Sequence, residues 1–153
     1  MRNTEALENG KDTLARLLLM TNKLRIIGDR ALDGEMTIRQ WLLTLAVAQY
    51  GDIPPTLSEV AEIMGTSHQN VKQLALRLHK QGFLKIEKDK VDQRATCLVL
   101  TEKSCLFWEK RQIEIRHFLT ELFKDFSSED INAMDEYLRK LYKSLQKIGE
   151  ERK

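Results

Sequence analysis

Two short helical segments joined by a tight glycine turn constrain this chain more than any other feature of its sequence. Thr56 and Glu59 have the spacing of a capping box, in which the N-cap residue and the third helical residue cap each other's backbone. Gly65 ends this segment, because glycine adopts the left-handed conformation at low cost. A second helix follows at once, with Thr66 or Ser67 as its N-cap. This order predicts a helix-turn-helix.

The pattern after Gly82 changes from helical to strand-like. Residues 83–88 alternate apolar and charged side chains, which is typical of a half-buried strand. Residues 89–94 are a polar loop, and residues 95–100 are predicted to form a second strand. A helix-turn-helix followed by a hairpin is a winged helix. We therefore expect a mainly α fold with a small β-hairpin wing.

Amphipathic helices are predicted on both sides of this region. A capping box at Thr37 and Gln40 begins a largely buried helix ahead of the helix-turn-helix. A helix over about residues 9–29 precedes it, and helices over about residues 101–125 and 127–148 follow the wing. The last of these carries apolar residues at alternating spacings of three and four, which is a heptad pattern.

The chain therefore divides into three parts of one compact molecule. We expect an N-terminal dimerisation helix (residues 1–33), a winged helix-turn-helix (residues 36–101) and C-terminal dimerisation helices (residues 102–153). A helix of about 24 residues is about 36 Å long, which is more than a small winged helix can cover. The apolar stripes can pack within one chain or against a second copy, and we favour a homodimer because two-fold dimers are the commonest oligomers. The expected dimerisation residues are Leu14, Leu17, Phe118, Leu122, Leu138, Leu141 and Leu145.

Composition excludes several classes of protein. The 25 basic and 23 acidic residues leave a net charge of +2, which excludes a histone-like polycation. No stretch approaches the length of about 18 apolar residues that indicates a membrane span, and no secretory signal is recognisable. The two cysteines, Cys97 and Cys105, make no disulfide framework. We expect a cytoplasmic protein without a membrane partner.

The second helix of the helix-turn-helix carries residue types suited to a nucleic-acid surface. Gln and Asn side chains pair bidentately with adenine, and Arg and Lys reach guanine or phosphate. Residues 67–94 contain seven basic and three acidic residues and are therefore +4, whereas the rest of the chain is −2. The alternative is an ordinary solvated helix face, but the position of the charge on this motif favours double-stranded DNA. The expected DNA-contacting residues are Ser58, Thr66, Ser67, His68, Gln69, Asn70, Lys72, Gln73, Arg77, Lys90 and Arg94.

The predicted wing places one arginine at the tip of the hairpin. An exposed Arg94 can enter the minor groove, where narrow A·T tracts concentrate negative potential. Asp92, two residues earlier, can hold the guanidinium in place. The alternative is a simple solvated turn.

These segments resemble the MarR family of transcriptional regulators. Asp92-x-Arg94 and the following residues 95–103 resemble the family's wing and the strand after it. The preceding segments are also similar, namely Leu57-Ser58-Glu59-Val60-Ala61, Met64-Gly65-Thr66-Ser67, Asn70-Val71 and Leu78-x-x-x-Gly82-Phe83-Leu84. One departure is Ser104, where the family often has glycine.

The resemblance implies more than the residues show directly. It implies a homodimer whose first, fifth and sixth helices form the interface. It also implies a recognition helix in the major groove, the wing arginine in the minor groove, and small-molecule effectors that bind between the two lobes. Trp41 and Trp108 are candidates for lining an effector cavity, although a core position is the better interpretation for both.

The remaining candidates for chemistry are weak. The histidines are scattered and form no metal-binding spacing, so we expect no metal and no cofactor. Cys97 is interpreted as a small core residue, and Cys105 as a weak candidate for redox sensing, because the family's sensors commonly place that cysteine in the first helix. No nucleophile elbow, phosphate loop or acid–base pair is present, so we expect no enzyme.

Two hypotheses from different classes follow. The first is a dimeric, sequence-specific regulator of transcription, a repressor that binds pseudo-palindromic operators with half-sites about one helical turn apart and is released by a small ligand. The second is a winged-helix module that binds protein and not DNA. The +4 segment favours the first.

Overall fold

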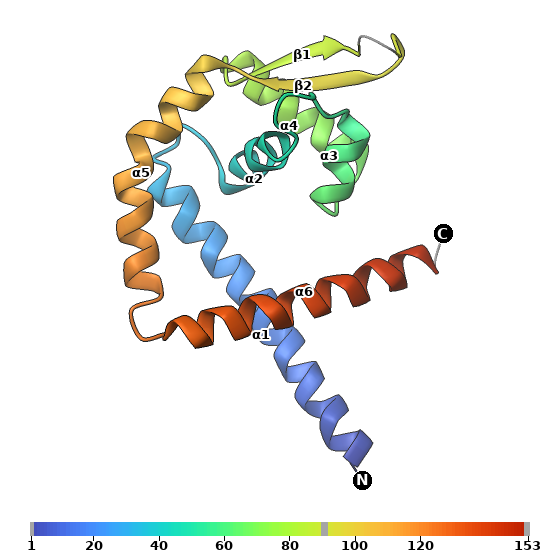
Figure 1. The fold of residues 1–153 in the computed structure, drawn as a ribbon, viewed down its shortest axis with the longest axis vertical. Helices are drawn as coiled ribbons and strands as arrows, with labels where there is room; N and C mark the ends of the chain where they lie inside the picture. The colour runs from blue at the N-terminus through green and yellow to red at the C-terminus, as the bar shows by residue number, and fades with distance from the viewer. Residues whose placement is uncertain (1, 90–91, 152–153) are drawn as a thin grey trace. The chain divides into compact units, whose positions relative to one another are not determined.

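The computed structural model describes residues 2–89 and 92–151, with side chains from residue 7 onward. In this part of the chain, six helices and two strands follow one another in the predicted order (Figure 1). They are α1 (Arg2–Ala31), α2 (Ile38–Ala48), α3 (Leu57–Ile63), α4 (His68–Lys80), β1 (Leu84–Lys88), β2 (Thr96–Leu100), α5 (Glu102–Leu122) and α6 (Ser128–Glu150). The chain divides into two compact units between Phe107 and Trp108, inside α5.

Capping boxes begin three of the helices, and two of them, at Thr37 and Thr56, are predicted from the sequence spacing. The side chains of Thr37, Thr56 and Ser127 each accept the backbone N–H of the third helical residue, whose own side chain caps the N-cap backbone in return. Ser67 caps α4 by accepting the Asn70 N–H at 3.2 Å. The helix starts are therefore fixed by local sequence, as the spacing predicts.

Left-handed glycines form both turns of the helix-turn-helix region. Gly65 has a φ of 59° between α3 and α4, and Gly82 has a φ of 80° between α4 and β1. A residue with a side chain would be strained at either position. The two glycines thus end α3 and α4 where the sequence predicts it.

The wing is an antiparallel hairpin. Leu84 lies opposite Leu100, and Lys88 lies opposite Thr96, so each strand is one residue shorter at its start than predicted. The far edge of β2 is also paired, because the Leu98 N–H donates to the carbonyl of Pro55 at 2.9 Å. The segment just before α3 therefore anchors the middle of β2.

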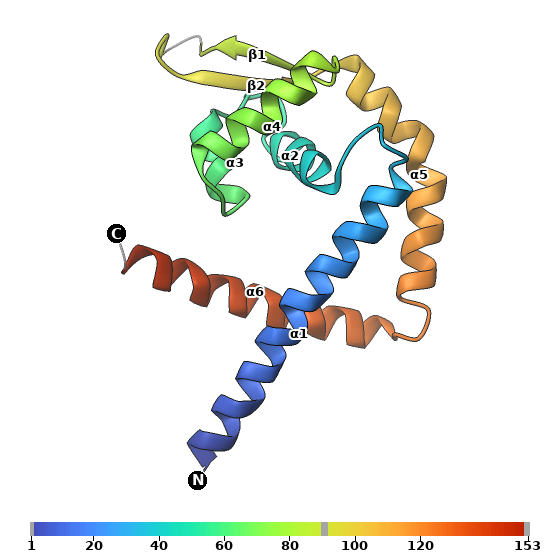
Figure 2. The ribbon, with the colours of Figure 1, turned by 180° about the vertical axis from the view of Figure 1, so that it is seen from behind.

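The core lies between the hairpin and the helices of the first unit. Figures 1 and 2 show α2, α3 and α4 gathered on one side of the two strands. The residues that join them are fully buried: Leu43 in α2, Val60 in α3, Val71, Ala75 and Leu78 in α4, and Leu98 in β2. Burying a leucine side chain contributes about 1.5–3 kcal/mol, so this cluster holds α4 firmly against the wing.

Two predicted helix boundaries were wrong. The first helix begins at Arg2 and not near residue 9, because residues 2–8 contain no proline or glycine that would stop it, although the apolar stripe begins later. α5 ends at Leu122 and not near residue 125, because the Phe126 N–H bonds three residues back, to Phe123, in a tight turn ahead of the Ser127 cap.

Across the described residues, none of the helices combines the length and the apolar character that a membrane span requires. The described residues also contain no group of three His, Cys, Asp or Glu side chains arranged to hold a metal ion.

Candidate nucleic-acid interface

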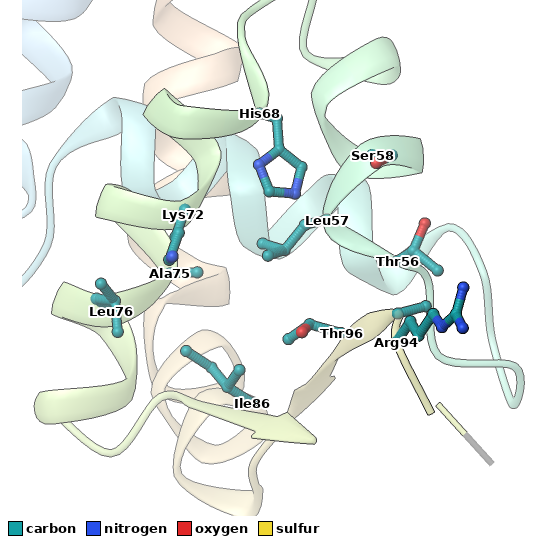
Figure 3. Close-up of a pocket in the computed structure, with 11 residues that line it drawn as sticks. Thr56, Leu57, Ser58, His68, Lys72, Ala75, Leu76, Ile86, Arg94 and Thr96 are labelled. Carbon is teal, nitrogen blue, oxygen red and sulfur yellow. The ribbon is translucent and has the colours of Figure 1, made fainter. Parts of the chain in front are cut away.

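A groove of about 420 Å³ lies between α3, α4 and the wing (Figure 3). Its cationic or titratable side chains are His68 and Lys72 from α4 and Arg94 from the wing. The start of α3 and the start of β2 contribute hydroxyl groups, and the apolar part of the lining comes from α3, α4, β1 and the end of the wing loop. The hydroxyl-bearing residues are Thr56, Ser58 and Thr96, and the apolar ones are Leu57, Ala75, Leu76, Ile86 and Ala95. Cations and hydroxyl donors together suit a phosphate-bearing ligand.

The structure separates the two faces of α4. Val71, Ala75 and Leu78 are fully buried against the core, as the helical spacing predicts. The opposite face is exposed and carries the polar residues predicted to contact DNA: His68, Gln69, Asn70, Lys72, Gln73 and Arg77. Leu76 lies on the same exposed face and lines the groove. The exposed face of α4 is therefore mainly polar, interrupted by Leu76, and carries side-chain types that can hydrogen-bond to base edges or phosphates.

The first turn of α4 is ordered by its own side chains. The Asn70 side-chain amide donates to the Thr66 hydroxyl at 3.1 Å, and the Asn70 backbone is capped by Ser67. The N-terminal backbone amides of a helix favour anions, because the helix dipole is positive there. Thr66, Ser67 and Asn70 thus shape the end of α4 that borders the groove.

Asp89 organises the described part of the wing loop. One of its carboxylate oxygens accepts the Asp92 N–H at 2.7 Å, and the other accepts the Cys97 thiol at 3.3 Å. Its backbone N–H donates to the Ala95 carbonyl at 3.1 Å. Asp89 therefore ties the loop to β2 on either side of Arg94.

Asp92 contacts the arginine through the backbone. Its carboxylate accepts the Arg94 N–H at 2.9 Å, and the Arg94 side chain is exposed at the edge of the groove. A role for Asp92 in holding the guanidinium itself stays a prediction. Lys90, also expected to contact DNA, lies outside the described residues.

Sequence reasoning missed part of the groove. It treated Thr56 only as a helix cap and Ile86 only as a strand residue, and it did not single out Thr96. The register of the hairpin could have indicated Thr96, because it pairs Thr96 with Lys88 next to the wing loop. The two tryptophans considered for an effector cavity, Trp41 and Trp108, are both half-buried.

The thiol of Cys97 is held in its protonated form. Burial first of all, and then the hydrogen bond to Asp89 and that residue's negative charge, raise its pKa from 9.0 to about 11. Cys97 is 4% exposed, as expected for a small core residue, whereas Cys105 is exposed on α5.

We expect iodoacetamide at pH 8 to label Cys105 in the folded protein and to leave Cys97 unmodified. A pKa two units above the ordinary value means about a hundredfold less thiolate at this pH, in addition to steric protection. Mass spectrometry of time points measures both sites, and labelling in urea is the control in which both should react. Equal labelling rates in the folded protein would contradict the assigned wing geometry.

Comparison with known proteins finds a family match over part of the chain. Residues 35–95 match the model of the MarR family. The transcriptional activatory protein BadR of Rhodopseudomonas palustris (strain ATCC BAA-98 / CGA009) is 27% identical over 143 residues, which are 88% of this chain and 79% of BadR.

Solved structures share the fold along nearly their whole length. The transcriptional regulator SlyA superposes with a TM-score of 0.80 at 19% identity, covering 93% of this chain and 99% of SlyA. S. aureus MepR, solved as a DNA complex, gives a TM-score of 0.72 at 20% identity, covering 86% of this chain and 96% of MepR. Residues 35–95, which hold the helix-turn-helix and the first strand of the wing, are therefore similar to the MarR family of transcriptional regulators, and the chain shares the winged-helix fold of the solved regulators.

Proposed function

We propose that this protein is a cytoplasmic, dimeric regulator that binds pseudo-palindromic operators, with α4 in the major groove and Arg94 in the adjacent minor groove. The observation that carries the proposal is the groove between them. A DNA strand that passes from the major to the minor groove exposes its phosphates between α4 and the wing, where His68 and Lys72 line the surface. The fold shared with MepR, solved as a DNA complex, supports this placement.

The dimer is proposed from the apolar faces of the terminal helices. Within its own unit, α6 has no buried residue, although Leu138, Leu141 and Leu145 repeat along one side of it. In α1, Leu14 is 52% exposed, and Leu17 is half-buried; in α5, Phe118 and Leu122 are also exposed. Apolar faces of this length promote aggregation unless a partner covers them. In a two-fold dimer, a second copy covers them with the same faces of its own helices.

The direction of regulation has two candidates. Repression is the simplest outcome for a dimer bound over a promoter, because it blocks access to that DNA. The similarity to a protein named a transcriptional activatory protein favours activation as the second candidate. Release by a small effector, with Trp41 and Trp108 as residues that would line its site, stays a prediction within this proposal.

Selection of bound sequences from a random duplex pool tests the proposed function. We expect the purified protein to enrich an inverted repeat whose half-sites lie about one helical turn apart. A reporter placed behind the enriched sequence then gives the direction of regulation. If the folded protein enriches no sequence at near-physiological salt, the operator-binding proposal is wrong, and the hypothesis of a protein-binding winged helix is favoured.

Replacing Lys72 by alanine is expected to weaken binding about equally for all DNA sequences. A lysine bound to phosphate releases about one counterion, so the slope of log K against log salt should fall by about one for each subunit. Titrations at several salt concentrations measure this slope. Lys124→Ala removes an equally charged, exposed side chain outside the groove and should leave the slope unchanged. If the Lys72→Ala protein has the wild-type slope, Lys72 does not contact the DNA phosphates.

A further inference from the structure

Three consecutive carbonyl groups at the end of the recognition helix are bound by the start of α5. They belong to Gln81, Gly82 and Phe83, which connect α4 to β1. Each accepts a hydrogen bond from a different side chain among residues 101–104, at the start of α5. The pairs are Lys103 Nζ to Gln81 O at 2.7 Å, Thr101 Oγ1 to Gly82 O at 2.7 Å and Ser104 Oγ to Phe83 O at 2.8 Å. We call Thr101, Lys103 and Ser104 the α4–α5 clamp.

The clamp satisfies groups that the backbone leaves open. The last carbonyls of a helix have no partner within it, and the left-handed Gly82 prevents further helical bonds. Phe83 is 3% exposed and Ser104 is fully buried, so water cannot replace the serine hydroxyl there. The Phe83 carbonyl also accepts the Thr101 N–H at 3.2 Å, which fixes the first residue ahead of α5 to the same point.

Ring contacts reinforce the same junction. The Lys103 ammonium lies 4.5 Å from the centre of the Phe83 ring, and the Phe107 ring meets Phe83 edge-on with centroids 5.2 Å apart. On the other side, the Gln81 side chain accepts a hydrogen bond from the buried Gln40 of α2 at 3.2 Å. The end of α4 is therefore held from both α2 and α5, and the first turn of α5 has little freedom to change its angle to α4.

The angle matters because α5 is long. It continues without interruption from Glu102 to Leu122, and a helix of this length spans about 30 Å. A change of about 10° at one end moves the other end by about 5 Å, which exceeds the rise of about 3.4 Å between base pairs. If the terminal helices hold the proposed dimer together, a change in the direction of α5 at the clamp changes the distance between the two copies of α4.

We propose that Thr101, Lys103 and Ser104 are specificity-determining positioning residues, which fix the half-site spacing that the dimer accepts. The proposal rests on the dimeric operator-binding function above. None of the three needs to touch DNA for this role, since they act through the end of α4.

The test measures discrimination between spacings and not affinity alone. The enriched inverted repeat is prepared with one base pair added to or removed from its centre, and Kd is measured for each duplex. For each protein, the Kd for a duplex of altered spacing is divided by the Kd for the original duplex. We expect this ratio to be about three- to tenfold smaller in Lys103→Met, in Ser104→Gly and in their double variant than in the wild type. The control is Glu102→Gln, which changes an exposed side chain in the same turn of α5 and should keep the wild-type ratio.

Each outcome separates the inference from the proposed function. A uniform loss of affinity at every spacing, with an unchanged ratio, indicates a purely structural role and overturns the inference alone. If the wild-type protein binds no inverted repeat, the proposed function fails and the inference fails with it. Melting curves show whether each variant is folded. The single Lys103→Met variant changes a side chain that reaches the surface, so it is expected to fold even if a variant of the buried Ser104 does not.

Discussion

Replacing Arg94 by alanine is expected to cost about 1–3 kcal/mol of binding free energy for each half-site, or roughly five- to 150-fold. The loss counts twice in a two-fold dimer, because both wings lose their arginine. The physical reason is the position of the side chain. It is exposed at the edge of the groove, on a loop whose backbone is fixed by Asp92 and Asp89, so little ordering is needed before it enters DNA.

The conservative variant separates charge from shape. Arg94→Lys keeps the positive charge but loses the planar guanidinium, so it should retain part of the affinity and lose preference for narrow A·T-rich minor grooves. Kd values on operators with A·T or G·C flanks measure both effects. An Arg94→Ala protein that binds both operators as wild type does would show that the wing lies away from the DNA.

Leu141→Glu in α6 is expected to break the dimer and to lower operator affinity by about a hundredfold or more, because two linked half-site contacts become one. Two-fold symmetry would bury two carboxylates in an apolar interface, which is costly for each of them. Light scattering after size exclusion gives the oligomeric state, and titration of the operator gives the affinity.

Asn132→Glu is the matched control for this substitution. It makes the same change of charge on α6, at a position outside the apolar repeat, and should leave both the dimer and the affinity unchanged. A Leu141→Glu protein that remains dimeric at low concentration would place the interface on other faces than the α6 stripe.

Local signals in the sequence were sufficient for most of the winged helix. Capping boxes at Thr37 and Thr56 and the left-handed glycines at 65 and 82 act over three or four residues, so each helix boundary they define could be predicted from spacing alone. The start of α1 could not, because the helix extends beyond its apolar stripe where no residue stops it.

The parts that depend on tertiary contacts could not be predicted. The alternation of β1 and β2 indicates a hairpin, but it does not show that the Cys97 thiol reaches Asp89 across the wing loop. The departure at Ser104 was visible in the sequence, yet its partner, the Phe83 carbonyl, lies 21 residues away and is defined only by the packing of α5. The groove likewise joins α3, α4 and β2, which contribute to it from separate segments of the chain.

The pairing of β2 with the segment ahead of α3 bears on edge-to-edge aggregation. A two-stranded sheet has two open edges, and each is a template for a strand from another molecule. The edge of β2 is already occupied by the segment at Pro55 and Thr56. The edge strand β1 carries Lys85, Glu87 and Lys88 among its five residues, and charged side chains of this kind oppose fibril-like stacking. Exchange of these charges for threonine or valine would turn the same wing into a seed for aggregation.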